Sequence, residues 1–221
     1  MRALAARGMS FVAVAGENDK LNFQRYQKVI DRTFDEDVTG DDIYYVGDRA
    51  FYRCVDIGNV DLPNLIECGQ YSFCRDYRSA NTNLHLVNLP RCKVVGKNAF
   101  YMSARFTNPN VSDGQVFLPA VETIGEAAFM YSGFVYFDIG ENVKSIGVRA
   151  FCNPEVNSNS IVRVIIRAKQ PPTIGAYAFL YSNTNMSAEF PNLTRAQVEA
   201  IANYPWNGKK FVASDDEWTV S

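Results

Sequence analysis

Apolar residues recur along the chain in one short pattern: an apolar residue, Gly, two variable residues, Ala or Ser, and Phe. Six segments match it, namely Val46–Phe51, Cys68–Phe73, Val95–Phe100, Ile124–Phe129, Ile146–Phe151 and Ile174–Phe179. Successive repeat glycines are 22, 27, 29, 22 and 28 residues apart. A period of this length is typical of a solenoid, in which each unit buries its apolar face against the next. The pattern predicts one continuous structural domain.

A second pattern lies seven to ten residues before each glycine, where buried-type residues alternate as in a strand with one covered face. Asp61, Asn88 and Phe117 each stand between a Val and a Leu-Pro pair, so we expect them to point outward. Because proline cannot donate to a strand ladder, each Leu-Pro marks the end of a strand and a corner of the coil. The strands at 135–139 and 162–167 continue the series.

The residues of the repeat itself are expected to build the interior. The glycine allows an approach that a Cβ would obstruct, the small residue lets neighbouring coils come close, and the Phe fills the core. Six Phe side chains in register predict an aromatic spine. A short helical or 3-10 turn is expected around each Gly-x-x-Ala-Phe.

The N-terminal residues predict a cap for the array. Between 18 and 34, Phe23, Tyr26, Ile30 and Phe34 fall at helical spacing with charged residues between them, which predicts an amphipathic capping helix. Residues 1–16 carry two arginines and no acid and include Ala13-Val14-Ala15, which has the form of a signal cleavage site. A folded arm and a cleaved signal both remain open for this segment.

The C-terminal residues predict a second cap. Residues 188–191 suit a last strand, and Thr194 and Gln197 have the spacing of a capping box at the start of a helix. Trp206 and Phe211 are expected to close the core. The predicted organisation is therefore an N-terminal arm and capping helix at 1–37, an array of about six units at 38–192, and a C-terminal cap and tail at 193–221.

Composition narrows the classes of partner. Hydrophobic residues make up 47 % of the chain and charged residues 21 %, which is typical of a folded domain. The formal net charge is -2, with both signs interspersed, so nucleic acid is not expected as a partner. No run approaches the roughly 20 apolar residues of a membrane helix, and we expect no transmembrane segment.

Reactive residue types give no catalytic or metal site. The five cysteines, Cys54, Cys68, Cys74, Cys92 and Cys152, lack CxxC pairs, and four of them occupy repeat positions filled elsewhere by apolar residues. They are expected to be buried thiols, with a Cys68–Cys92 bridge as the alternative. The single histidine, His85, suits an outward strand position. We therefore expect no enzyme activity, no metal and no cofactor.

The Ile-Gly-x-x-Ala-Phe core, preceded by Leu-Pro and a further apolar residue, resembles the BspA-like type of leucine-rich repeat over about residues 38–192. Cys68 and Ser72 depart from the pattern. The resemblance implies a curved right-handed leucine-rich repeat solenoid with a parallel sheet along one face. It also implies a bacterial or microbial surface protein, extracellular or secreted, that mediates adhesion or protein binding.

The outward face of the predicted sheet is the candidate ligand-binding surface. Its expected members are Asp61, Asn88, Phe117, Tyr136, Asp138, Arg163 and Arg167, acidic at the first end, aromatic in the middle and basic at the other. Loops at 77–78 and 105–111 are a second candidate. The sequence predicts a binding module for a protein or glycan. A structural or assembly subunit of a phage virion or cell-surface complex is the alternative, and the oligomeric state stays open.

Overall fold

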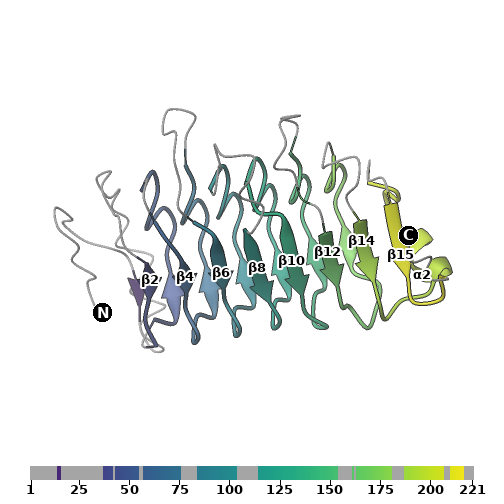
Figure 1. Ribbon diagram of the computed structural model, residues 1–221, viewed down its shortest axis with the longest axis horizontal. Helices are drawn as coiled ribbons and strands as arrows, with labels where there is room; N and C mark the ends of the chain where they lie inside the picture. Colours follow the sequence, from purple (N-terminus) through teal and green to yellow (C-terminus); the bar gives the residue numbers. More distant parts are fainter. Residues whose placement is uncertain are drawn as a thin grey trace.

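The computed structural model is a solenoid whose coils stack along one axis, from β2 at one end to β15 at the other (Figure 1). The structure describes residues 14–15, 37–41, 43–54, 57–75, 84–103, 114–153, 161, 163–180, 187–206 and 210–216. The predicted capping helix and the loops at 77–78 and 105–111 lie outside these residues.

An eight-stranded sheet runs the length of the solenoid and contains the predicted strands. Its order is β15-β14-β12-β10-β8-β6-β4-β2, and every neighbouring pair is parallel. The strands are β2 (Val38–Thr39), β4 (Val60–Asp61), β6 (Leu86–Asn88), β8 (Gln115–Leu118), β10 (Tyr136–Ile139), β12 (Arg163–Ile166), β14 (Ser187–Phe190) and β15 (Lys210–Ala213). The alternating pattern therefore located this sheet, while β15 was not predicted.

A second sheet, absent from the sequence prediction, follows the apolar residue before each repeat glycine. Its order is β1-β3-β5-β7-β9-β11-β13, parallel except for β1. The strands are β1 (Val14–Ala15), β3 (Tyr45–Val46), β5 (Glu67–Cys68), β7 (Val94–Val95), β9 (Thr123–Ile124), β11 (Ser145–Ile146) and β13 (Thr173–Ile174). Each strand is two residues long, so it shows no alternation that a sequence pattern could reveal. The predicted parallel sheet along one face is confirmed, and this second sheet accompanies it.

The Gly-x-x-Ala-Phe segments are hydrogen-bonded turns and not helices. In the third unit the Ala99 N–H donates to the Gly96 carbonyl, and the Phe100 N–H reaches the Ala128 carbonyl of the next coil at 2.8 Å. The second variable residue has a positive φ in all six units, at Arg49, Tyr71, Asn98, Ala127, Arg149 and Tyr177. These left-handed residues turn alternate N–H groups toward the next coil, so the turn segments also form a ladder. We call the surface that they build the turn face.

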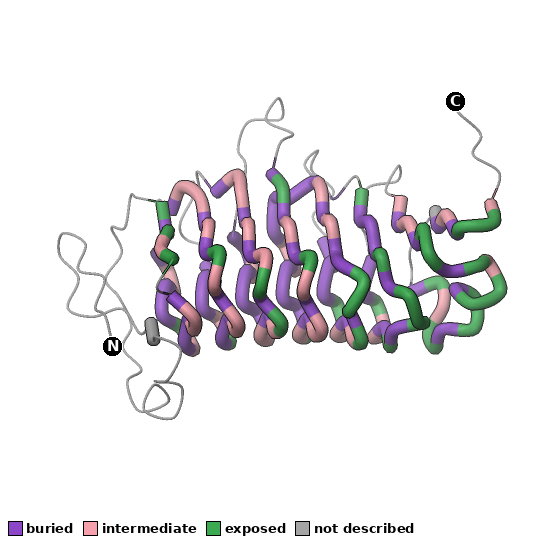
Figure 2. Tube along the Cα trace, turned by 90° about the horizontal axis from the view of Figure 1, so that it is seen from below, coloured by how far each residue is buried: buried purple, intermediate pink, exposed green. Residues whose placement is uncertain are grey.

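Glycine and phenylalanine stack in two columns inside this arrangement. A Cβ on Gly125 would lie 2.6 Å from the Lys97 nitrogen of the preceding coil, so the close approach expected of the repeat glycine is confirmed there. The six repeat Phe rings form the predicted spine, with centroids 4.9–5.8 Å apart and ring planes within 8°. Buried segments recur at the same place in each coil (Figure 2).

The two residues that depart from the family pattern contact each other. Cys68 stands where other units have Val or Ile, and Ser72 stands where they have Ala. Both are fully buried, and the Cys68 Sγ and Ser72 Oγ atoms are 2.9 Å apart. The thiol therefore provides a partner for a hydroxyl that would otherwise be costly to bury. All five cysteines are free and buried, so the expected thiols are confirmed and the Cys68–Cys92 bridge does not form.

The C-terminal residues cover the last strand of each sheet. Thr194 caps α2 (Arg195–Glu199) through the predicted capping box with Gln197, and Trp206 and Phe211 are buried against the end of the spine. The outer edge of β15 is occupied by side chains: Arg195 Nη2 donates to the Phe211 carbonyl and the Ala213 N–H donates to Asp216.

The edge of β13 is treated in the same way, because Asn203 Nδ2 donates to the Ile174 carbonyl at 3.1 Å. At the opposite end of this sheet, β1 pairs with β3. Exposed edges invite pairing with further strands, and these contacts occupy edge groups that such pairing would use.

Candidate functional site

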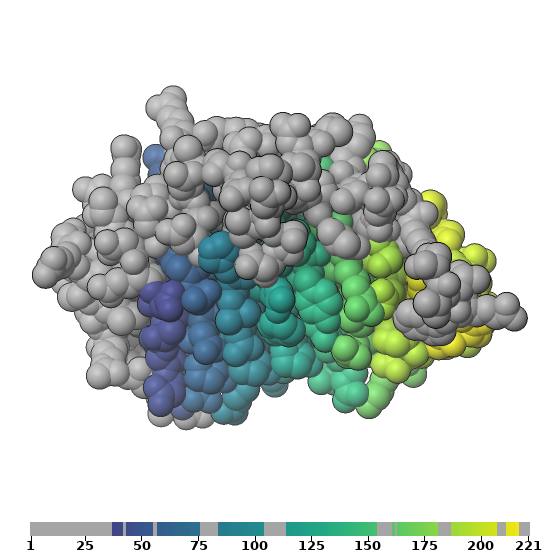
Figure 3. Space-filling view, viewed as in Figure 1, coloured from purple at the N-terminus to yellow at the C-terminus, as the bar shows by residue number. Residues whose placement is uncertain are grey.

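The outward side of the eight-stranded sheet, here called the outer face, carries all seven residues predicted as a site. Parallel pairing sets side chains from successive coils side by side, about 4.8 Å apart. One row is Thr39, Asp61, Asn88, Phe117, Asp138, Ile165, Glu189 and Val212. The adjacent row is Leu86, Gln115, Tyr136, Arg163 and Ser187. The coils appear as consecutive bands from purple to yellow in Figure 3.

An aromatic pair lies in the middle of the outer face. The Phe117 and Tyr136 rings are half-buried, with centroids 6.0 Å apart and planes inclined by 53°. Tyr136 Oη lies 3.5 Å from Asp138 Oδ2. The pKa of Tyr136 is raised, first by burial and then by the Asp138 charge. The tyrosine therefore stays a neutral phenol and offers both an apolar ring and a polar tip.

The two arginines are paired with carboxylates, which corrects the expectation of a basic end. Arg167 donates from Nε and Nη2 to Asp138 at 2.7 and 2.8 Å. Arg163 makes the same two-bond contact to Glu189, also at 2.7 and 2.8 Å. Hydrogen bonding to these carboxylates raises the pKa of each arginine. The C-terminal end of the outer face therefore carries ordered ion pairs and not unpaired positive charge.

Glu189 is the residue that the sequence reasoning missed. It lies between Ala188 and Phe190 in the predicted last strand, where alternation alone would have placed it outward. Its contact with Arg163 depends on the register between β12 and β14, in which Ile165 pairs with Glu189. At the other end, Asn88 Nδ2 donates to Asp61 Oδ1 at 2.9 Å. Six of the seven predicted residues thus contact one another: Asp61 with Asn88, Phe117 with Tyr136, and Asp138 with both Tyr136 and Arg167.

A small pocket opens at the C-terminal end of the outer face. Its volume is about 230 Å³, and its lining comprises Arg163, Ile165, Arg167, Glu189, Pro191, Val212, Ala213 and Ser214. Ile165 is 6 % exposed and gives the pocket an apolar wall together with Val212. An aliphatic side chain of a partner could pack against this apolar wall and be surrounded by a polar rim. Pockets of this kind hold the anchor residues of protein interfaces.

The described residues offer few groups for covalent or metal chemistry. No group of three or more His, Cys, Asp or Glu side chains that could hold a metal ion occurs in the part of the chain that the structure describes. His85 lies half-buried one residue before β6, and not within the strand as expected. Burial raises the pKa of Cys54 and Cys68 to about 12, so these thiols remain protonated and are poor nucleophiles.

Comparison with protein families agrees with the architecture. The family model described as "BspA type Leucine rich repeat region" matches residues 32–155 and 93–212, with six copies of the repeat. No curated protein matches the chain. Among the described residues, no helix has the length and apolar character needed to cross a membrane.

Proposed function

The chain belongs to the BspA-type leucine-rich repeat family, and from that premise we propose that it is a non-catalytic recognition module that binds a protein through its outer face. The observation that carries the proposal is the half-buried pair Phe117 and Tyr136 at the centre of this face. Tyrosine and phenylalanine are enriched at protein interfaces. Their mutual contact holds both rings in place, so binding would cost little side-chain entropy.

The neighbouring polar contacts support the same proposal. Arg163 and Arg167 are each fixed by two hydrogen bonds to a carboxylate. Arginine held in this way presents its remaining N–H donors in a fixed orientation, which favours specific contacts. A partner would place apolar side chains on the aromatic pair and in the pocket beside Ile165, with polar groups at the rim.

We further propose an extracellular or cell-surface location, in keeping with the surface proteins that the repeat resembles. Disulfide-free domains with exposed thiols oxidise outside the cell. Here all five thiols are buried, and burial raises the pKa of Cys92 well above its ordinary value and that of Cys152 to about 11. The free cysteines are therefore compatible with an oxidising environment. Labelling of intact cells with an impermeant biotin reagent tests the location.

Selection of ligands on the purified chain tests the proposed function. A phage-displayed library of random peptides and a glycan array serve as probes for the wild type and for a Phe117→Ala/Tyr136→Ala double variant. We expect peptides enriched by the wild type to lose binding to the double variant by at least about tenfold while its circular dichroism spectrum stays unchanged. A Val148→Ala/Tyr177→Ala variant removes the two large hydrophobic side chains that are 40 % and 45 % exposed on the turn face and is the matched control.

Three results would contradict the proposal. Equal binding by wild type and double variant would exclude the aromatic pair. An equal loss in the control variant would show that any exposed apolar group suffices. Ligands found only on the glycan array would replace the protein partner with a sugar.

The alternative role in an assembly rests on residues 1–16, of which the structure describes only Val14–Ala15. Because these two residues pair with β3, their deletion would open a sheet edge and could itself cause association. A deletion of residues 1–12 is the cleaner experiment. Loss of an oligomer in light scattering after this deletion would favour assembly.

A further inference from the structure

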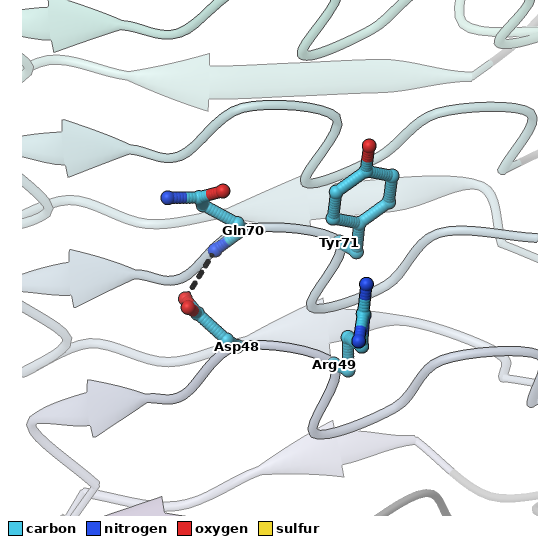
Figure 4. Close-up of a pocket in the computed structure, with 4 residues that line it drawn as sticks. All are labelled: Asp48, Arg49, Gln70 and Tyr71. Carbon is cyan, nitrogen blue, oxygen red and sulfur yellow. Dashed lines mark hydrogen bonds between the residues drawn. The ribbon is translucent and has the colours of Figure 1, made fainter. Parts of the chain in front are cut away.

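A polar pocket lies on the turn face between the first two repeat units, away from the outer face. It has a volume of about 180 Å³ and is lined by Asp48, Arg49, Gln70 and Tyr71. These are the two variable residues that follow Gly47 and Gly69. Figure 4 shows the four side chains on adjacent coils, with Arg49 beside Tyr71 and Asp48 beside Gln70.

Contacts among these residues hold the pocket in one arrangement. Asp48 Oδ1 accepts the backbone N–H of Gln70 at 2.7 Å. The Arg49 guanidinium carbon lies 5.5 Å from the centre of the Tyr71 ring, within the range of a cation–π contact. The Tyr71 ring in turn meets Tyr52 edge-on at 6.4 Å. The arginine is therefore ordered by stacking while its N–H groups stay available at the edge of the plane.

The pocket offers both hydrogen-bond donors and one anionic acceptor. The guanidinium of Arg49, the side-chain amide of Gln70 and the hydroxyl of Tyr71 can donate. Among the described residues, Asp48 Oδ2 makes no hydrogen bond, whereas Oδ1 accepts the backbone N–H of Gln70. A ligand that satisfies this set must bring acceptors for Arg49 and Gln70 and a donor for Asp48.

The fifth and sixth units repeat the arginine–tyrosine pair without the polar pocket. Arg149 lies 5.9 Å from the centre of the Tyr177 ring, and both residues have the same positive φ as Arg49 and Tyr71. The positions of Asp48 and Gln70 are held there by Val148 and Ala176. This second pair therefore separates the effect of the stack from that of its polar neighbours.

We propose that the pocket binds a uronic acid residue of an acidic glycan. The sugar carboxylate would accept from Arg49 and Gln70, since arginine matches carboxylate geometry with two parallel bonds. A ring hydroxyl would donate to Asp48 Oδ2, and the apolar edge of the sugar ring would contact Tyr71. The pocket is smaller than the roughly 300–1,000 Å³ of sites for drug-sized ligands, which suits one sugar ring with the rest of the glycan in solvent.

Asp48 is the reason to prefer a sugar acid over an acidic peptide. An aspartate or glutamate side chain brings only acceptors to the pocket and would face the Asp48 carboxylate without a hydrogen between them. A uronic acid carries hydroxyl donors on the same ring as its carboxylate. Its binding is independent of the outer face, so this proposal and the proposed protein recognition can fail separately.

Titration with small probes tests the site. Methyl glucuronide supplies carboxylate and hydroxyls, methyl glucoside only the hydroxyls, and glutarate only carboxylates. We expect methyl glucuronide to bind with a dissociation constant on the order of 1 mM and to shift the side-chain NMR signals of Arg49 and Gln70. Methyl glucoside and glutarate should each bind at least about tenfold more weakly, because each leaves part of the charged site unpaired.

Variants assign the roles of the four side chains. Arg49→Ala should weaken methyl glucuronide binding about tenfold or more, while Arg149→Ala, the matched control, should leave it unchanged. Asp48→Asn keeps an oxygen that accepts the Gln70 N–H but removes the negative charge. It should therefore weaken the binding of methyl glucuronide and strengthen the binding of glutarate. Gln70→Ala changes an exposed residue and provides a second test if Arg49→Ala does not fold.

Several results would overturn the proposal. Equal binding of methyl glucoside would remove the carboxylate from recognition. Glutarate binding as tightly as methyl glucuronide would point to acidic peptides instead. Equal losses of methyl glucuronide affinity in Arg49→Ala and Arg149→Ala would show that binding depends only on the net charge of the protein. If the pocket and the outer face are separate sites, the Phe117→Ala/Tyr136→Ala variant should bind methyl glucuronide as the wild type does. A loss of binding in this variant would contradict the assignment to the pocket.

Discussion

Replacement of Phe129 by Ala probes the aromatic spine at a ring that contacts four other rings. The Phe129 ring stacks between Phe100 and Phe151, with centroids 5.2 and 5.8 Å away, and meets Phe134 and Phe137 edge-on at 6.2 and 5.0 Å. Its side chain is fully buried. Truncation of a buried core Phe to Ala lowers the free energy of unfolding by about 3–5 kcal/mol. The four ring contacts of Phe129 place its loss toward the upper end of this range.

That loss is large compared with the total stability of a domain, which is about 5–15 kcal/mol. For a chain of this size, each kcal/mol lowers the melting temperature by about 2–4 °C, so a decrease of roughly 6–20 °C is expected. Urea unfolding followed by far-ultraviolet circular dichroism gives the free energy of unfolding. Val148→Ala at a 40 % exposed position is the control and should change it by less than about 0.5 kcal/mol.

A destabilisation by Phe129→Ala below about 1 kcal/mol would refute the reasoning. It would mean that neighbouring coils collapse into the space at little cost, which the fixed backbone ladders on both sides of the spine should prevent. A Phe129→Leu variant fills part of the space and should fall between wild type and Phe129→Ala.

Three further predictions concern the core thiols and the sheet edges. In a double-mutant cycle, Cys68→Val and Ser72→Ala should show a coupling of about 0.5–1.5 kcal/mol in unfolding free energy, because either substitution alone already removes the hydrogen bond between the two side chains. Additive effects would contradict this prediction. Since burial raises the pKa of Cys68 from 9.0 to about 12, the folded state keeps a proton that the unfolded state loses. The unfolding free energy should therefore decrease as pH rises from about 9 to 12, less steeply in Cys68→Val. Arg195→Ala combined with Asn203→Ala frees the edges of β15 and β13, so light scattering should detect concentration-dependent association; a monomer at all concentrations would show that these edges are protected otherwise.

Alternation in the sequence was sufficient to locate the outer face, because one side of each strand packs on the core. Phe117 lies between two residues that are fully buried, Val116 and Leu118, and the pattern therefore placed it outward. The prediction that it binds a ligand remains a prediction. Charge pairing could not be foreseen, since Arg163 and Glu189 meet only through the register between two coils.

The second sheet and the left-handed residue of each predicted turn escaped prediction for local reasons. Strands of two residues contain no periodic signal. A positive φ at non-glycine residues such as Arg49 and Tyr71 is disfavoured by intrinsic preference, and here the hydrogen bonds to the next coil impose it. The pocket between these two residues depends on that geometry, so neither spacing nor residue type pointed to it.

The parallel register of the outer face has an evolutionary consequence. Each coil contributes one residue to the longer outward row, while the repeat glycine and phenylalanine that join the coils are the same in all six units. Duplication or exchange of a coil would therefore insert or replace one outward residue in a row and leave the glycine and phenylalanine contacts between coils unchanged. The outward residues can therefore change one coil at a time while the buried core stays the same.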